Sequence, residues 1–250
     1  MLDFSSPMDS VYLIIDAETA RVSGERESAV RRVLEQTTKP AANIKDPMKM
    51  ILNVFEKIET AIDKSSLDPN LGELSMIGVR CINENKGTVD TILFTRWDAG
   101  SEAKMLADFF DWLRELSAKA IITMCGKGLK RFDFPMIKVR AIVNRVDGWL
   151  LLPKTRDYST AIFDLEDTDI WPGAGRDYMP SLDDIALALG IEVENPGSGK
   201  DMPAAFAEGN FGLIEDHNVS DLKTTHAVLV RLGLIPEFET ANTVEDLNVT

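Results

Sequence analysis

The sequence contains only two cysteines, Cys81 and Cys125, and only two histidines, His217 and His226. Two cysteines are too few for a thiolate zinc cluster or a disulfide scaffold, so we expect both to be free thiols buried among apolar residues. No apolar run reaches the length of about 18–20 residues that a membrane span requires. Met1–Ser10 carries two aspartates and no basic residue, unlike a signal peptide. These absences predict a cytoplasmic protein with no membrane contact.

Basic residues are scarce as well, with 27 Lys and Arg against 41 Asp and Glu and a net charge of −14. This balance argues against a broad basic surface for nucleic acid, although metal ions and a small basic patch can neutralise phosphates locally. The charge is uneven along the chain. Residues 127–147 carry six basic and two acidic side chains, whereas residues 156–221 carry three basic and 15 acidic ones. A site that includes both segments would combine opposite charges.

The chain has 250 residues, of which 44% are hydrophobic, and this is enough for one domain with a large core. Apolar patterns predict strands at 11–15, 75–81, 91–95 and 120–124, and helices at 25–36, 48–64, 101–119, 134–143, 181–189 and 211–232. This order predicts an α/β fold, a mixed sheet flanked by helices. We expect one domain over 1–236, with a helical insertion at about 21–72 between the first two strands, and an acidic tail at 237–250.

The predicted insertion has two interpretations, which the sequence leaves equally open. It is either a packing appendage or a cap over a cleft. Its methionines, such as Met48 and Met50, are interpreted as core filler because methionine fits irregular apolar gaps.

Asp16 and Glu18 end the first predicted strand, directly after five apolar residues. Side chains at positions i and i+2 of a strand point to the same side, and two neighbouring carboxylates repel unless a cation lies between them. Such pairs also arise by chance in an acidic chain. Because α/β sheets place their sites at the ends of central strands, we expect this pair to be functional.

Three other candidates are weaker when each is taken alone. Asp133 precedes a predicted helix, where capping of that helix is the simplest interpretation. His217 and Asp221 lie four residues apart on one face of the last predicted helix, and the alternative to a functional pair is an exposed ion pair. His226 is interpreted as structural.

The order of the carboxylates Asp16, Glu18, Asp133 and Asp221 resembles the DEDD superfamily of 3′–5′ exonucleases, which share a ribonuclease H-like fold. The closer resemblance is to predicted exonucleases related to the proofreading domain of family B DNA polymerases. It covers roughly 11–19 and 73–233 and rests on four segments, 12–19, 126–140, 181–191 and 217–225. Cys125 stands where the family usually has Asn. His217 stands where one branch has Tyr, and Asp216 where the other has His.

The resemblance implies hydrolysis of phosphodiester bonds at nucleic-acid 3′ ends, DNA favoured over RNA, with two Mg²⁺ or Mn²⁺ ions as cofactors. Asp16 would bridge the ions, Glu18 and Asp221 would complete the ion on the nucleophile side, and Asp133 would hold the other. His217 would position or deprotonate the attacking water. The expected substrate contacts are Lys127, Lys130, Arg131, Phe132 and Arg140.

The resemblance also implies partners. They are single-stranded or frayed 3′ ends and, since no polymerase or helicase segment is evident, a replication or repair protein in trans. Two alternatives stay open. The fold could bind nucleic acid or a replication partner with weakened or no activity, as the departures at Cys125 and His217 would allow, or it could cut strands internally.

Overall fold

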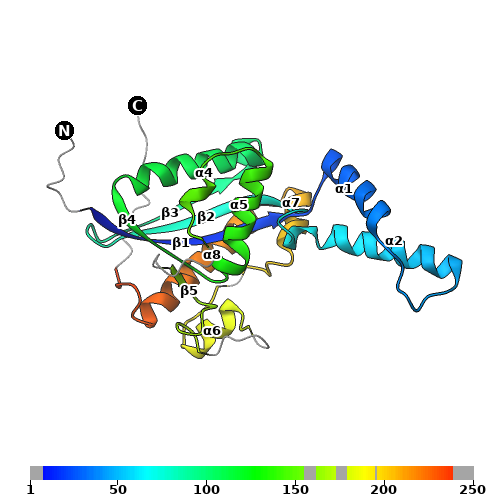
Figure 1. Ribbon diagram of the computed structural model, residues 1–250. Helices are drawn as coiled ribbons and strands as arrows, with labels where there is room; N and C mark the ends of the chain where they lie inside the picture. Colours follow the sequence, from blue (N-terminus) through cyan, green and yellow to red (C-terminus); the bar gives the residue numbers. More distant parts are fainter. Residues whose placement is uncertain (1–7, 155–161, 173–178, 195, 239–250) are drawn as a thin grey trace.

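The computed structural model describes residues 8–154, 162–172, 179–194 and 196–238 (Figure 1). Its sheet has five strands in the order β3-β2-β1-β4-β5. The strands are β1 (Asp9–Ala20), β2 (Glu73–Asn83), β3 (Thr88–Thr95), β4 (Ala120–Gly126) and β5 (Ile162–Asp164). β1 is central, antiparallel to β2 and parallel to β4. The predicted mixed α/β sheet is confirmed.

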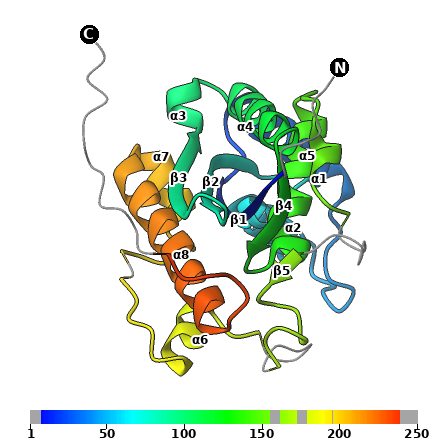
Figure 2. The same ribbon diagram turned by 90° about the vertical axis from the view of Figure 1, so that its left-hand side faces the viewer.

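Helices cover both faces of this sheet (Figure 2). They include α4 (Glu102–Ser117) and α5 (Phe134–Val143) on one face, and α6 (Leu182–Ala188) and α8 (Phe211–Arg231) on the other. Leu13 and Ile15 of β1 belong to the core under α4 and α5, whereas Ile14 packs with side chains of α6 and α8. This alternation explains why residues 11–15 form a continuous apolar run, because a strand that is covered on both faces has no polar side.

A buried ion pair joins α5 to α4 and β2. Glu102 accepts hydrogen bonds from Arg140 Nε at 2.8 Å and Nη2 at 2.6 Å, from the Leu74 backbone N–H at 2.7 Å and from the Asn144 amide at 2.8 Å. Burial alone would raise the pKa of Glu102, but these donors and the charge of Arg140 outweigh it and lower the pKa. Arg140 is only 2% exposed. The expectation that Arg140 contacts substrate is therefore replaced by a structural role.

Residues 21–72, between β1 and β2, form a two-helix arm that projects away from the sheet (Figure 1). The arm contains α1 (Gly24–Thr37), α2 (Pro47–Asp63) and the short 3-10 helix η1 (Ser65–Leu67). Its small core consists of Val22, Ile58 and Ile62, with Val30, Leu34 and Val54 packed against them. Met48 lies outside this core and is 66% exposed, so its interpretation as core filler is wrong.

Several short elements have no counterpart in the sequence-based prediction: α3 (Arg96–Ala99), the π-helical turn η2 (Leu129–Asp133), the 3-10 helix η3 (Trp149–Leu151), β5 and α7 (Met202–Glu208). All are too short to show a hydrophobic period. Most of the predicted acidic tail lies outside the described residues. Cys125 is buried as expected, but Cys81 is only partly buried, and both are free thiols. None of the described helices is long and apolar enough to cross a membrane.

Candidate active site

Asp16 and Glu18 lie within β1, because the strand continues to Ala20 and does not end at the acids. The parallel pairing with β4 stops at Ile14, opposite Cys125, whereas the pairing with β2 continues past Asp16, which lies opposite Gly78. The two carboxylates therefore extend beyond the carboxyl end of β4. Asp16 and Glu18 follow Ile14 by two and four residues, so their side chains point to the same side of the sheet as Ile14. This is the side that α8 covers.

α8 brings His217 and Asp221 to these carboxylates. His217 Nε2 lies 3.8 Å from Glu18 Oε1 and 3.8 Å from Asp221 Oδ2. The histidine is 5% exposed, and its Nδ1 is buried with no hydrogen-bond partner in the described part of the chain. The alternative of a solvent-exposed His–Asp pair is therefore excluded, since the imidazole is enclosed between two carboxylates.

Asn218, which the sequence analysis missed, fixes the position of Asp16. Its side-chain amide donates to Asp16 Oδ2 at 2.6 Å and to the Asp16 backbone oxygen at 3.3 Å. This contact depends on Gly78 of β2, because a Cβ there would lie 1.7 Å from Asn218 Oδ1. A glycine in the interior of a strand is the signal that could have indicated a close approach at this point.

Asp133 approaches the other carboxylates around the end of β4. It lies at the end of η2, is 3% exposed, and its Oδ1 accepts a hydrogen bond of 3.2 Å from the backbone N–H of Ala17. Its side chain makes no capping hydrogen bond to α5. The interpretation of Asp133 as a helix cap is wrong, and its carboxylate instead joins η2 to the strand that carries Asp16 and Glu18.

Burial raises the pKa of all four acids, and repulsion from the other acids of the site adds to this effect for Asp16 and Glu18. Burial, followed by the charges of Glu18, Asp133 and Asp221, raises the pKa of Asp16 well above its usual range. Burial and the same kind of repulsion raise the pKa of Glu18 to about 8. Burial raises the pKa of Asp133 to about 7 despite the Ala17 hydrogen bond. Burial also raises the pKa of Asp221, against the lowering effect of His217 and Lys127. Negative charge at this site therefore destabilises the folded chain unless a cation is present.

The donor set fits a hard divalent cation, because it consists of carboxylate oxygens whose repulsion such an ion would relieve. A closed cage is not preformed. Among the described residues, no group of three or more histidine, cysteine, aspartate or glutamate side chains is arranged so that it could hold a metal ion. The thiol of Cys125, next to this site, is buried, and burial raises its pKa to about 12, so it supplies no thiolate.

The basic residues predicted to contact substrate are engaged by acids that follow β5. Lys127 Nζ lies 3.2 Å and Arg131 Nε 2.7 Å from Glu166, and Lys130 Nζ lies 2.6 Å from Asp167. Lys127 is close enough to the carboxylates for its charge to lower the pKa of Asp221. A phosphate that binds these cations must exchange with their carboxylate partners. Phe132 packs against the core beneath α4 and α5.

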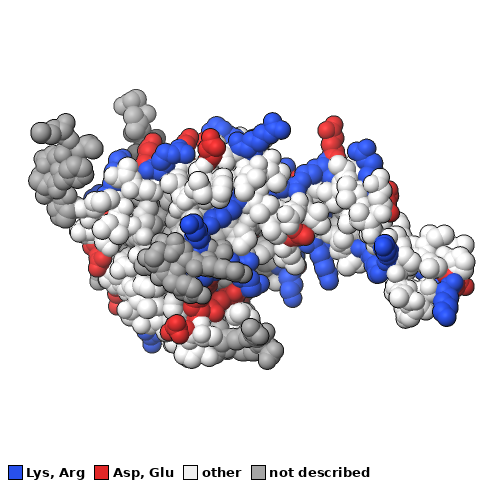
Figure 3. All heavy atoms as spheres, viewed as in Figure 1, with Lys and Arg blue, Asp and Glu red and all other residues white. Residues whose placement is uncertain are grey.

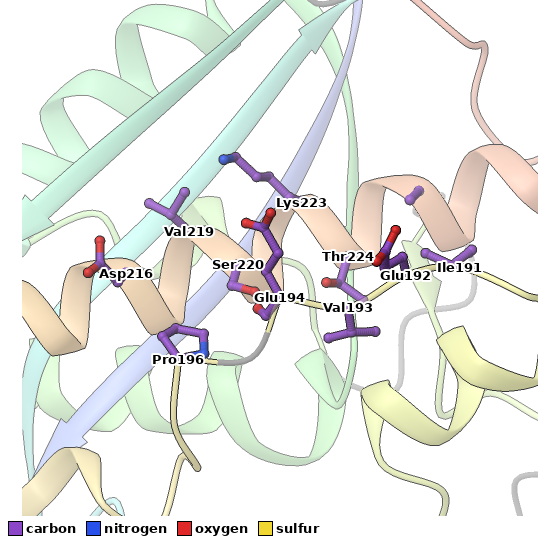
Figure 4. A pocket seen from close by; sticks show the side chains of 11 residues that line it. Ile191, Glu192, Val193, Glu194, Pro196, Asp216, Val219, Ser220, Lys223 and Thr224 are labelled. Carbon is purple, nitrogen blue, oxygen red and sulfur yellow. Dashed lines mark hydrogen bonds between the residues drawn. The ribbon is translucent and has the colours of Figure 1, made fainter.

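A cavity of about 870 Å³ lies along α8, but none of the four site carboxylates lines it (Figure 4). It is formed by α8 and the segment before α7 that contains Glu192 and Glu194, and Ser220 of α8 donates a hydrogen bond to the backbone oxygen of Glu194. With Glu192, Glu194 and Asp216 against Lys223, its lining is acidic overall. It is therefore distinct from the carboxylate site and unsuited to a phosphate.

Comparison with solved structures gives a fold that is already known. Among solved structures, the family B DNA polymerase from Pyrobaculum calidifontis aligns with a TM-score of 0.54 and 15% identity over 93% of this chain, but over only 25% of the polymerase chain. E. coli exonuclease I in complex with an oligonucleotide aligns with a TM-score of 0.42 and 15% identity, over 89% of this chain and 41% of the other. No curated protein matches. The likeness to the polymerase confirms the expected ribonuclease H-like fold.

A family model gives the more specific result. It describes a predicted 3′–5′ exonuclease related to the exonuclease domain of PolB, and it matches residues 73–248. The match covers more than half of the chain and includes two of the four site acids, Asp133 and Asp221. This protein therefore belongs to the family of predicted 3′–5′ exonucleases related to the exonuclease domain of PolB.

Proposed function

We propose that the protein is a metal-dependent 3′–5′ exonuclease that removes nucleotides from single-stranded or frayed DNA ends, with RNA as the poorer substrate. One observation carries the proposal. Carboxylates from β1, η2 and α8 are close enough for their charges to act on one another, and two of them, Glu18 and Asp221, lie 3.8 Å from His217 Nε2. The membership of the exonuclease family supports the reaction, and the likeness to a DNA polymerase supports DNA.

Asp16, Glu18, Asp133 and Asp221 are the residues that would hold the metal. When bound there, two Mg²⁺ or Mn²⁺ ions would supply an activated water and would stabilise the charge on the leaving 3′-oxygen. The protein contributes orientation. The amide of Asn218 holds one oxygen of Asp16, and the Ala17 N–H holds one oxygen of Asp133, so both acids are positioned before substrate binds.

His217 is the proton acceptor in this proposal. Its Nε2 lies between Glu18 and Asp221 and takes the proton of the attacking water. The two carboxylates stabilise the imidazolium that forms, because each lies 3.8 Å from that nitrogen. The phosphates of the nucleic acid bind the basic side chains of Lys127, Lys130 and Arg131. In doing so they replace the carboxylates of Glu166 and Asp167 as the partners of these side chains.

The test is degradation of matched 5′-labelled DNA and RNA strands with Mg²⁺, with Mn²⁺ and with EDTA. We expect a ladder of products that shorten stepwise, faster on DNA, and none in EDTA. Asp16→Asn should lower the rate by about 10³-fold or more at an unchanged fold. Glu115→Gln, at an exposed position on α4, is the matched control and should keep the wild-type rate. If Asp16→Asn trims the strand as fast as the wild type, the assignment of the site is wrong. Short internal fragments would instead indicate an endonuclease.

A second candidate is a nucleic-acid-binding module with weakened activity. The observation in its favour is that the Asn218 amide already occupies an oxygen of Asp16, while no closed ion cage is preformed in the described residues. Calorimetric titration with Mn²⁺ separates the candidates. An exonuclease should show binding heat that Glu18→Ala removes, whereas a module without catalysis should show none.

A further inference from the structure

Four large apolar side chains form an exposed stripe on α2, which we call the α2 stripe: Met48, Ile51, Leu52 and Phe55, with exposed fractions of 66, 65, 53 and 58%. Their spacing of three, four and seven residues puts them on one face of the helix. Figure 3 shows that the arm carries both basic and acidic side chains on its surface. Soluble proteins rarely leave a contiguous patch of this kind uncovered unless something binds there.

The described part of this chain supplies no cover for the α2 stripe. The face of α2 that packs within the arm uses other residues, Val54, Ile58 and Ile62. The arm also carries the stripe away from the sheet and its helices (Figure 1). At this distance from the sheet, the α2 stripe is accessible to a second molecule.

Charges beside the α2 stripe fit the same stripe on a second copy. Lys49 and Glu56 are both exposed on α2, and neither pairs with an opposite charge among the described residues. Seven residues turn a helix by about 700°, so the two side chains lie within about 20° of each other on one flank of the stripe. When two such helices pack antiparallel, the order along one is reversed relative to the other. Lys49 of each copy then lies beside Glu56 of the other.

We propose that the protein forms a two-fold dimer in which the α2 stripes of two copies pack antiparallel. The interface is isologous, so each Lys49–Glu56 contact occurs twice. The overall charge allows this approach. The arm, residues 21–72, has nine basic and eight acidic residues, which gives it a net charge of +1. The rest of the chain therefore has a net charge of −15. The arms can therefore meet while the acidic bodies stay at opposite ends.

The test is sedimentation velocity of the full chain at protein concentrations from about 1 to 100 µM, the range in which a small interface dissociates. We expect a shift from the 27.7 kDa monomer to a species of twice that mass as the concentration rises. Ile51→Glu should abolish the shift. Leu187→Glu, which places the same charge at a 77% exposed leucine on α6, should leave it intact. Circular dichroism checks that the variants fold.

Charge exchange tests the antiparallel arrangement independently of the apolar contact. Lys49→Glu and Glu56→Lys should each weaken the dimer about tenfold, and the double variant should restore it, because the exchanged charges meet again across the two-fold axis. Dimerisation that survives Ile51→Glu would overturn the proposal, as would a double variant no tighter than the single ones. A protein that stays monomeric at every concentration would also overturn it. That result would indicate that the α2 stripe binds a different protein.

Discussion

The carboxylate site should make the protein less stable in the absence of metal. Glu18 has an ordinary pKa of 4.5, which burial and the charges of Asp221 and Asp133 raise to about 8 in the folded chain. Between these values the folded state binds more protons than the unfolded state, so folding becomes less favourable as the pH rises from 4.5 to 8. At about 1.4 kcal/mol per pH unit, the full rise corresponds to about 4–5 kcal/mol.

Glu18→Gln removes this ionisation while keeping the shape of the side chain. Because neighbouring acids share the proton, we expect about half of that free energy to be regained, about 2 kcal/mol at pH 8 in EDTA. The gain should vanish near pH 4.5, where the glutamate is protonated in the folded chain. Urea denaturation of the wild type and the variant at several pH values measures the difference.

Two controls connect this stability to the metal. Glu115→Gln, on the exposed face of α4, should match the wild type at every pH. Mn²⁺ should stabilise the wild type at pH 8 and have little effect on Glu18→Gln, since ligand binding to the folded state raises stability in proportion to affinity. The reasoning is refuted if Glu18→Gln is no more stable than the wild type at pH 8 in EDTA, or if its advantage grows as the pH falls.

Three further predictions test other parts of the structure. Gly78→Ala should displace the amide of Asn218 and lower nuclease activity at least tenfold, with a loss of about 1–3 kcal/mol in stability; wild-type activity would contradict the contact. Arg140→Met leaves the Glu102 carboxylate buried without its cation, and urea denaturation should show a loss of about 3–5 kcal/mol. The pKa of His226 is lowered to about 4 by burial and a neighbouring arginine, so its contribution to stability is complete above pH 6.5 and is lost as the pH falls toward 4. The interval corresponds to about 3 kcal/mol, and screening by solvent lowers the loss that we expect relative to His226→Gln to about 2 kcal/mol; parallel pH profiles would refute it.

Local patterns were sufficient to predict the main helices and strands. The apolar run before Asp16 predicted the central strand, and the period of residues 211–232 predicted α8, which begins at Phe211 as expected. Both signals depend only on which side chains along one element are apolar, and that is a property of the sequence itself. The spacing of His217 and Asp221 likewise determined that they share a face of α8.

The contacts between distant segments were decided only by the tertiary structure. Asn218 reaches Asp16 across 202 residues of sequence, and Arg140 is buried against Glu102, 38 residues away. The pattern on α2 showed which face is apolar but not that the fold leaves Met48 uncovered. Periodicity describes one element at a time, whereas burial and pairing depend on what a second element brings to it, and that is determined only when the whole chain packs.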